Sequence, residues 1–445
     1  MRLFKSKEWI WVAVFIASLV YINYFSHQED FTVNMALYTV MFAVYIYFIR
    51  IRKELSDKSR DKLALFFHLI PLFALPALSP DVYRFIWDGE LVTHGIHPYR
   101  FTPNELIDSS FYQSSPYLQS LYSEMTELSK ANYSLYPTFN QIYFLVPALI
   151  SENVILSIII MRVLILVTAI FGYIYLKKLL IHLNLSADKA WIIALNPFII
   201  IEMTSNLHFE GVMLSLLFIS FYLLLTKKWI LAALFWALAI SVKLTPLILL
   251  PFLWRFVGWK RAFKVYFTTG VFTILILWIY LWPSLIPNFM KSVNLYFDNF
   301  QFNGSIFLIT EWISYPFYDY KTIRIFGPLL SQISIVLILF IAFLKPIKNG
   351  NVWFERMMWG YVIYLLFATT VHPWYIALPF GLSILTKNTF MIGWTFLIML
   401  SYGFYAVGNS ALSYTFICVE YIGLLIFITL DLYKKPNLLT RFMKI

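Results

Sequence analysis

The sequence is poor in cysteine and in charged residues. Its single cysteine, Cys418, stands in an apolar run, which excludes an intramolecular disulfide and any metal centre built from several cysteines. Charged residues make up 13% of the 445 positions and hydrophobic residues 60%, against roughly 25% and about 45–50% in a soluble domain. A water-soluble core cannot hide so much apolar surface, so the composition predicts an integral membrane protein.

The positive charge does not indicate a nucleic-acid partner. The net charge is +11, but the lysines and arginines stand in short clusters between apolar runs, as the positive-inside rule describes for cytoplasmic helix ends. We therefore expect membrane lipids around the chain and no nucleic acid. The same rule predicts that both termini are cytoplasmic, and we expect the protein in the plasma (inner) membrane.

Apolar runs of membrane-spanning length recur along the chain. A span needs about 20 apolar residues, and this length is met by residues 9–26, 33–50, 153–176, 265–282, 323–344, 353–371, 389–407 and 414–431. No small-residue cleavage pattern follows the first run, so we expect it to be retained as a helix. With residues 63–79 and the hairpins below, the pattern predicts an all-α polytopic membrane protein of about 13–14 transmembrane helices, forming one domain over residues 1–445.

Two apolar stretches, 189–227 and 228–255, have basic clusters at both ends. Each is expected to enter and leave on the same side, with arms of roughly 20–24 Å that are too short for a full span. The stretch 353–387 follows the same pattern. Irregular backbone at membrane depth is tolerated only where it is buried in protein or lines a wet cavity. The hairpin tips, 205–210, 241–246 and 371–375, are therefore predicted to line a site.

The outward connections carry the polar chemistry. Residues 80–137 form the large first outward loop, with interfacial helices, and residues 283–322 form the second; residues 139–150 are expected to be re-entrant or interfacial. The first loop is the only extended acidic region, with seven acidic residues against three basic ones. The acidic residues are Asp81, Asp88, Glu90, Glu105, Asp108, Glu124 and Glu127.

The first outward loop opens on the motif DVYRFIWDG, residues 81–89. Pro80 and Asp81 suit the start of a helix, and the spacing places Asp81, Arg84 and Asp88 on one helix face. An aspartate after a proline is also a common helix cap, and Asp-Arg-Asp at this spacing is often a surface ion pair. Both interpretations stay open from the sequence.

Each hairpin tip carries an ionisable side chain. These are His208 and Glu210, Lys243, and His372. An ionisable residue inside a membrane segment is a functional hypothesis by default, although Lys243 has snorkelling as an alternative and the others have structural hydrogen bonding. All three tips are expected on the same side as the acidic loop, around a shared pocket.

Taken together, these motifs resemble the GT-C superfamily of polyprenyl-phosphate-sugar-dependent glycosyltransferases, especially its mannosyltransferase-like members. The resemblance extends from residue 80 to residue 376. Besides residues 81–89, it rests on residues 94–99, Tyr136-Pro137, Gln141, and the segments 206–210, 242–246, 302–305 and 372–375. It implies transfer of a sugar, mannose favoured, from a polyprenyl-phosphate donor to a glycan or lipid acceptor on the non-cytoplasmic side, with inversion. Thr138 departs from the second proline of many relatives.

The resemblance also implies residue roles. Asp81 matches the catalytic aspartate of the family, and a lipid phosphate leaves readily enough that one carboxylate base suffices, unlike in a glycosidase. Asp88 is expected to assist catalysis by orienting Arg84 or an acceptor hydroxyl. The donor phosphate would be bound by Arg84, Lys243 and His372. The expected substrate-binding residues are Tyr83, Trp87, Tyr99, His208, Glu210, Asn303, Trp374 and Tyr375, for whose aromatic members an interfacial aromatic belt is the alternative.

No zinc motif or phosphate-binding glycine loop occurs, so no cofactor is expected; a divalent ion between Asp81 and Asp88 is the alternative.

Three rival functions are weighed. A multi-pass transporter or flippase for a lipid-linked glycan usually shows two related halves, and no repeat is visible. A polymerase or ligase with a diphosphate-linked donor would need more arginines in the outward loops. An assembly subunit without catalysis is the third.

Overall fold

The computed structural model describes residues 2–278, 285–298, 300–317, 322–347, 349–408 and 410–433. Within those ranges the chain is helical, and extended pairing is limited to two isolated bridges, Arg2 with Leu55 and Phe302 with Thr370. The predicted all-α class is confirmed.

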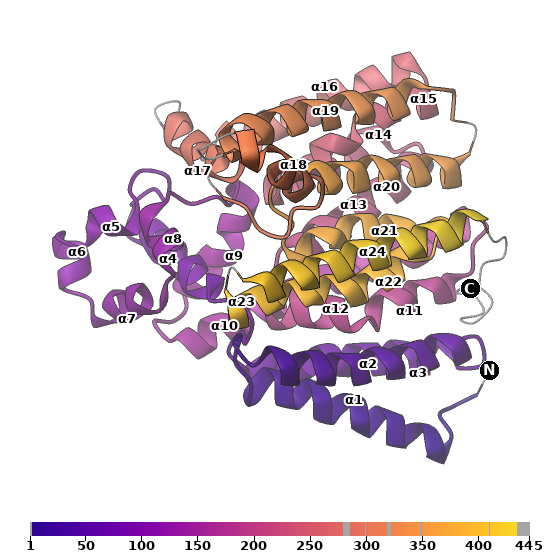
Figure 1. Cartoon of the computed structure of the whole chain (residues 1–445), viewed down its shortest axis with the longest axis horizontal. Coiled ribbons are helices and arrows are strands. Elements are labelled where there is room, and N and C mark those ends of the chain that lie inside the picture. Colours follow the sequence, from indigo (N-terminus) through magenta and orange to yellow (C-terminus); the bar gives the residue numbers. More distant parts are fainter. Residues whose placement is uncertain are drawn as a thin grey trace.

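The long helices lie side by side in a bundle (Figure 1). They are α1 (Ser6–Tyr24), α2 (Phe31–Ile51), α3 (Asp57–Leu69), α10 (Val154–His182), α13 (Glu210–Leu225), α14 (Trp229–Val242), α16 (Trp259–Trp278), α19 (Ile323–Phe343), α20 (Gly350–Phe367) and α24 (Ala411–Tyr433). The shorter helices α11 (Ala190–Ala194), α12 (Pro197–Ile199), α15 (Pro251–Val257), α21 (Ala377–Ser383), α22 (Phe390–Leu397) and α23 (Gly403–Val407) complete the bundle. The outer helix surfaces expose large apolar side chains such as Phe267, as a lipid-facing surface requires.

Fewer helices than expected meet a strict test for a membrane span. Among the described residues, five segments are long and apolar enough: 31–51, 154–182, 323–343, 390–407 and 411–433. A sixth is reached if 197–205 and 210–225, bent by 109°, count as one span. The expected number of about 13–14 is therefore not reached by this criterion. One reason is that predicted arms such as α14, with 14 residues, are too short; residues 279–282 of another predicted span lie outside the described ranges.

The three predicted hairpin tips are breaks between helices. Four residues separate the end of the π-helical turn η3 (Ile200–Ser205) from the start of α13 at Glu210. Helix α14 ends at Val242, and Lys243 is extended, with φ −148° and ψ 145°. After α20 the chain is not helical again until η7 (Pro373–Ile376). Proline explains part of the pattern, because Pro246 and Pro373 each stand at the start of the next turn.

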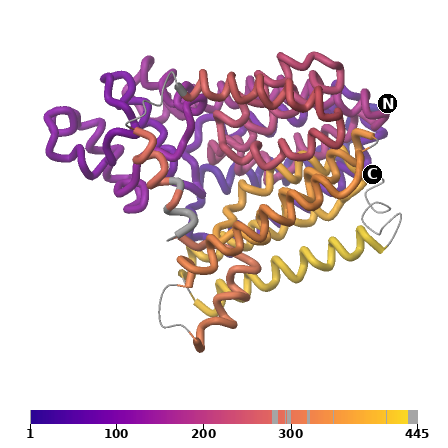
Figure 2. Tube along the Cα trace, turned by 90° about the horizontal axis from the view of Figure 1, so that it is seen from above, coloured from indigo at the N-terminus to yellow at the C-terminus, as the bar shows by residue number. Residues whose placement is uncertain are grey.

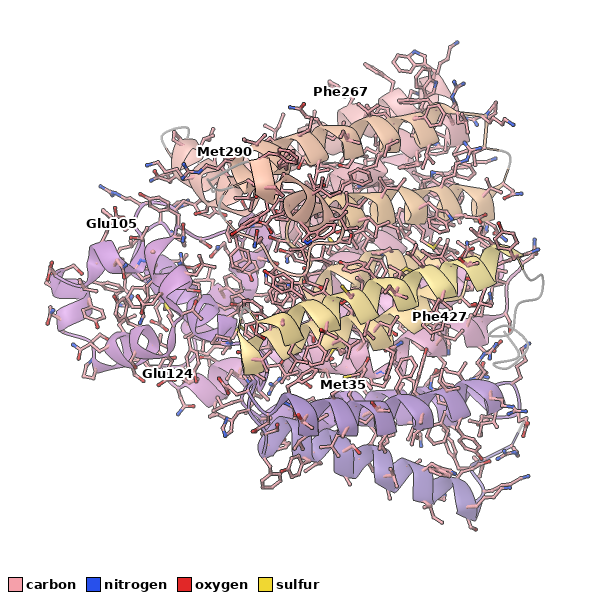
Figure 3. The ribbon with its side chains drawn as sticks, in the orientation of Figure 1. Met35, Glu105, Glu124, Phe267, Met290 and Phe427 are labelled. Carbon is pink, nitrogen blue, oxygen red and sulfur yellow. The ribbon has the colours of Figure 1, made fainter. Side chains whose placement is uncertain are left out.

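The first outward loop forms a group of short helices at one end of the bundle. It contains α4 (Asp81–Thr93), α5 (Pro103–Leu106), α6 (Ser110–Gln113), α7 (Pro116–Glu124) and α8 (Glu127–Ala131), followed by α9 (Thr138–Ala148). The start of α1 and the end of α24 lie at the opposite end of the bundle, which Figure 2 shows in a turned view. Glu105 and Glu124 mark the loop end in Figure 3. The second outward loop contributes α17 (Ile286–Asp298) and α18 (Ile306–Ser314).

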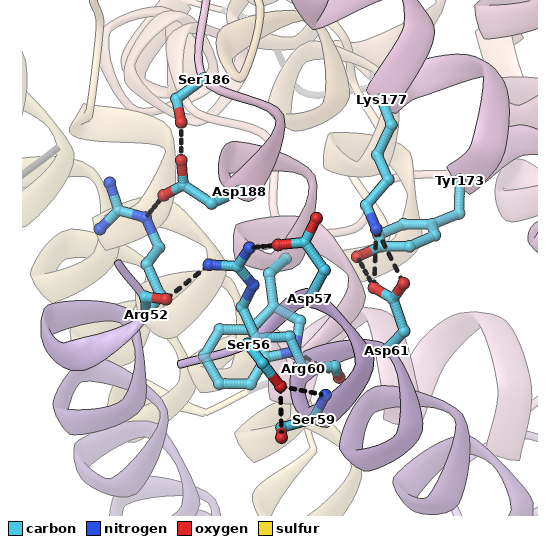
Figure 4. Close-up of polar contacts among 11 residues, drawn as sticks. Arg52, Ser56, Asp57, Ser59, Arg60, Asp61, Tyr173, Lys177, Ser186 and Asp188 are labelled. Atoms are coloured by element: carbon cyan, nitrogen blue, oxygen red, sulfur yellow. Dashed lines mark hydrogen bonds and ion pairs between the residues drawn. The ribbon is translucent and has the colours of Figure 1, made fainter. Parts of the chain in front are cut away.

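The end of the bundle that holds the start of α1 is fixed by charged side chains (Figure 4). Arg52 pairs with Asp188 at 2.7 Å, and Arg60 donates to the Arg52 carbonyl at 2.5 Å. On α10, Lys177 pairs with Asp61 at 2.8 Å. These contacts tie the turn between α2 and α3 to the later helices, so Arg52, Arg60 and Lys177 have structural partners.

Candidate active site

Asp81 is the first residue of α4, directly after Pro80 at the N-cap position. Its backbone N–H donates to Ser79 Oγ at 3.3 Å, and its side chain is half-buried. Burial raises the pKa of the Asp81 carboxyl, while the positive charge of Lys243 acts in the opposite direction. Asp81 is therefore a carboxylate held at the start of a helix, within electrostatic reach of a lysine from another element.

Lys243 forms an ion pair with Glu210. The two residues come from different helix breaks, since α14 ends just before Lys243 and α13 begins at Glu210. The Lys243 Nζ atom also lies over the Tyr375 ring, 5.2 Å from its centroid. Asn140, on α9, donates to the Val242 carbonyl at 3.0 Å and fixes the end of α14. The ammonium group is thus held by protein groups.

Two histidines from different helix breaks stack on the same tryptophan. His208 lies on one face of Trp374, with ring centroids 3.6 Å apart, and His372 lies parallel to Trp374 at 4.5 Å. Phe302, from the second outward loop, stacks on His372 at 4.8 Å. The charge of Lys243 acts on both histidines. Residues 208, 243 and 372, predicted to share a pocket, therefore lie in one cluster.

The second outward loop is attached to the segment that carries His372. The Phe302 N–H donates to the Thr369 carbonyl at 3.1 Å, and the Val371 N–H donates to the Phe302 carbonyl at 2.8 Å. Gly304 makes this approach possible, because a Cβ atom there would lie 2.9 Å from the Thr369 carbonyl oxygen. Asn303 is 5% exposed and donates to Glu420 of α24 at 3.1 Å. Asn303 therefore joins α24 to the edge of the cluster.

Arg84 and Asp88 form a network inside the first outward loop. Arg84 Nε donates to Asp88 at 2.8 Å, and Arg84 Nη1 donates to the carbonyls of Ser129 and Asn132. The other Asp88 oxygen accepts a hydrogen bond from Ser134. Asp88 is fully buried, and burial raises the pKa of its carboxyl, with Arg84 opposing. Two members of the predicted Asp-Arg-Asp face, Arg84 and Asp88, thus form a buried ion pair. Their hydrogen bonds attach α4 to residues 129–134.

Three aromatic residues predicted to bind sugar lie in the first outward loop. Trp87 is fully buried and packs near Tyr112 and Tyr122, at 6.2 and 6.3 Å between centroids. Tyr99 is also fully buried, and its hydroxyl donates to the Tyr136 carbonyl. Tyr83 is half-buried. In this structure Trp87 and Tyr99 belong to the core of the loop and present no open face to a ligand.

Arg162 and Glu202 are two buried residues that lie outside the motifs and helix breaks predicted from the sequence. Arg162, on α10, is fully buried and donates to four carbonyls, those of Leu72, Ala74, Thr204 and Ser205. It thereby fixes the segment 72–74, which precedes Asp81, and the turn at 204–205, which precedes His208. Glu202 accepts from the Tyr402 hydroxyl at 2.9 Å. Both are charged residues in apolar segments, a signal that the sequence did contain.

No group of three or more histidine, cysteine, aspartate or glutamate side chains suited to a metal ion occurs within the described part of the chain. In the cluster, positive charge is supplied by a side chain, that of Lys243.

A polytopic helical bundle with these polar groups gathered beside a helical outward loop defines a GT-C type, mannosyltransferase-like membrane protein. Residues 11–261 match the family described as "Alpha-(1->6)-mannopyranosyltransferase, N-terminal domain", and the chain belongs to that family. The matched residues include Asp81, Glu210 and Lys243.

Two curated proteins are similar to this chain. Alpha-(1->6)-mannopyranosyltransferase A of Corynebacterium glutamicum is 25% identical over 211 residues, which cover 45% of this chain and 41% of the relative. Alpha-(1->6)-mannopyranosyltransferase A of Mycobacterium tuberculosis is 23% identical over 336 residues, which cover 70% and 62%. The chain thus spans less than two thirds of the length of these relatives.

Proposed function

We propose that this protein transfers a mannosyl group from a polyprenyl-phosphate donor to a glycan or lipid acceptor at the non-cytoplasmic face of the plasma membrane, with inversion at the sugar carbon. The observation that carries the proposal is the position of Asp81 at the start of α4, within electrostatic reach of Lys243. The family supplies the choice of mannose.

The proposed reaction is a single displacement. The acceptor hydroxyl oxygen attacks the anomeric carbon of the donor sugar, and its proton passes to Asp81. The bond between that carbon and the phosphate oxygen breaks, and the phosphate leaves with the electron pair. Burial raises the pKa of the Asp81 carboxyl, which makes the carboxylate a stronger base for this step.

Lys243 and His372 are the proposed groups that stabilise the leaving phosphate. Lys243 is 20% exposed at its side chain and carries the charge of the cluster, and His372 is oriented by its stacking on Trp374. Preorganised cationic donors of this kind act where negative charge develops. Glu210 keeps Lys243 in position.

The proposed sugar contacts are on the Tyr375 side of the cluster. Trp374 has both ring faces covered, by His208 and His372, so only its edge remains for a ligand. Tyr375 is half-buried and lies beside Lys243. Glu210 is the other polar side chain proposed on this side of the cluster. Asn303, which donates to Glu420, is proposed to hold the adjacent segment in place.

The deciding experiment is a membrane assay with polyprenyl-phosphate mannose that compares the wild type with Asp81→Asn. We expect a loss of transfer of at least about 100-fold, the lower range for removal of a positioned base. The matched control is Asp108→Asn, an exposed aspartate of the same loop, which should keep wild-type transfer. Full activity in a folded Asp81→Asn variant would remove Asp81 from the mechanism. Movement of the donor across the bilayer by the wild type, without transfer, would favour the flippase alternative.

A further inference from the structure

We infer that Glu202 is a positioning residue of the site, which holds His208 by its Nε2 atom and, through the Trp374 ring, sets the position of His372. This inference rests on the proposed function, because it concerns how the phosphate-binding end of that site is kept in place.

The contact itself joins two buried atoms that lack other partners. Glu202 is fully buried and His208 is 2% exposed. The Glu202 Oε2 atom lies 3.4 Å from His208 Nε2, and neither atom has a hydrogen-bond partner among the described residues. Buried polar groups are nearly always satisfied. His208 Nε2 is therefore the ring nitrogen that faces Glu202, and the Asn206 side-chain amide is a second donor directed at the same carboxyl group.

The backbone is shaped to bring the two side chains together. Glu202 lies in the π-helical turn η3, where the Asn206 N–H donates to the Ile201 carbonyl at 2.9 Å. The His208 N–H then reaches back to the Glu202 carbonyl at 3.1 Å. Between them Leu207 has φ +61°, the left-handed region that a leucine rarely adopts. Single π-turns and strained residues of this kind concentrate at functional sites.

Tyr402 fixes the other oxygen of the carboxylate. Its hydroxyl donates to Glu202 Oε1 at 2.9 Å, from η8 (Ile398–Tyr402), 200 residues along the chain. Oε1 is bonded to Tyr402, and Oε2 is the oxygen that faces His208. The carboxylate therefore has one orientation, and a histidine that donates from Nε2 to it has a defined ring plane and a defined tautomer.

The ring plane of His208 is transmitted to His372 by stacking. The rings of His208 and Trp374 are 3.6 Å apart with an interplanar angle of 17°, and those of Trp374 and His372 are 4.5 Å apart at 3°. A carboxylate that orients a histidine which itself contacts the reacting group has the role of the outer partners of metal-bound histidines. Glu202 would act in the same way, but through three rings, because His208, Trp374 and His372 lie between it and the phosphate.

The test is a double-mutant cycle on transfer with polyprenyl-phosphate mannose. Glu202→Gln replaces one carboxyl oxygen by an amide nitrogen at nearly constant shape, and His208→Phe keeps a ring for Trp374 to stack on but removes Nε2. We expect Glu202→Gln to lower kcat by at least about 10-fold, and the double variant to be no worse than His208→Phe alone. Tyr402→Phe should lower kcat less than Glu202→Gln, because the contact with His208 remains.

Two control variants keep the experiment specific. Glu8→Gln changes another buried glutamate, at the far end of the bundle, and Tyr45→Phe removes a buried hydroxyl that donates to the Ile192 carbonyl. Both should keep wild-type transfer. Losses for Glu202→Gln and His208→Phe that add in the double variant would overturn the inference alone. A wild type that transfers no sugar would overturn the proposed function, and the inference with it.

Discussion

Lys243 and Glu210 form an ion pair that joins the ends of two interrupted helices, α14 and α13. Glu210 is 3% exposed and Lys243 20% exposed at the side chain. Each charge stabilises the other, because Glu210 is removed from water and Lys243 is largely so. The pair thereby holds both helix ends near Asp81. The positive charge of Lys243 acts to lower the pKa of the Asp81 carboxyl.

Replacement of Lys243 alone should therefore be worse than replacement of both partners. Lys243→Met leaves the Glu210 carboxylate buried and unpaired, with an expected loss of stability of about 3–5 kcal/mol. Lys243→Met with Glu210→Met should recover much of this stability but no transfer. Thermal unfolding in detergent and the transfer assay measure the two effects. A double variant as unstable as Lys243→Met would show that the pairing is not what stabilises the site.

Arg162→Lys should destabilise the fold although the charge is kept. The guanidinium of Arg162 donates to four carbonyls on two segments, and an ammonium on a shorter side chain cannot reproduce this fork. We expect a loss on the order of 3 kcal/mol in unfolding free energy, since hydrogen bonds from charged groups contribute about 1.5–3 kcal/mol each. The matched control is Arg356→Lys, where one exposed hydrogen bond to the Lys345 carbonyl is at stake. Equal midpoints for the two variants would contradict the role given to Arg162.

Glu90→Gln should stabilise the protein at high pH only. Glu90, on α4, is 3% exposed, and burial, with the nearby charge of Glu152, raises its pKa from 4.5 to about 7. The folded protein therefore binds this proton more tightly than the unfolded chain, so stability is lost as the pH rises from about 4.5 to about 7. Glutamine resembles the protonated acid and does not titrate. At pH 8 the variant should be more stable by up to about 3 kcal/mol.

Unfolding midpoints of the wild type and Glu90→Gln at pH 4 and at pH 8 check this prediction. The two proteins should agree at the lower pH and differ at the higher one. Glu124→Gln, an exposed glutamate of the same loop, is the control and should follow the wild type at both pH values. A Glu90→Gln variant that is no more stable at pH 8 than at pH 4, relative to the wild type, would contradict the burial argument.

Cysteine labelling tests the sidedness of the protein. In a Cys418→Ser background, needed because Cys418 is exposed, Asn104→Cys should react with an impermeant reagent added outside the cell. Lys58→Cys, at the other end of the bundle, should react only after the membrane is opened. Asn104 and Lys58 are both exposed, whereas Asn303, in the second outward loop, is too buried to serve. The opposite labelling pattern would invert the proposed topology.

Chelation of divalent ions should leave mannosyl transfer unchanged. The proposed phosphate ligands are side chains, both oxygens of Asp88 already accept hydrogen bonds, from Arg84 and from Ser134, and the described residues hold no group of three or more histidine, cysteine, aspartate or glutamate side chains suited to a metal ion. The measurement is the transfer rate before and after dialysis against EDTA. Activity that disappears and returns on addition of Mg²⁺ or Mn²⁺ would establish a metal requirement that the side chains described here do not explain.

Much of the site was predictable because it is built on helix breaks and a helix start, which depend on residues that are neighbours along the chain. Paired basic clusters predicted the three helix breaks, and the break positions at Glu210, Lys243 and His372 are confirmed. The proline before Asp81 predicted the start of α4, which is also confirmed. The number of spans was harder to predict, because hydropathy shows where a segment is apolar but does not show how long each helix remains unbroken.

The sequence by itself determined the all-α class, the positions of the helix breaks and the polarity of the first outward loop, since these depend on residues that are neighbours along the chain. Only the tertiary structure decided which polar groups meet. In it, Tyr402 donates a hydrogen bond to Glu202, 200 residues away along the chain. Arg162 donates to four carbonyls that are distant in the sequence. The tertiary structure also buried Trp87 and Tyr99, whose aromatic rings the sequence could not distinguish from that of Tyr375. The reason is physical: a hydrogen bond or a stacked ring depends on distances of a few ångströms between elements, and hydropathy and spacing along the chain do not specify these distances.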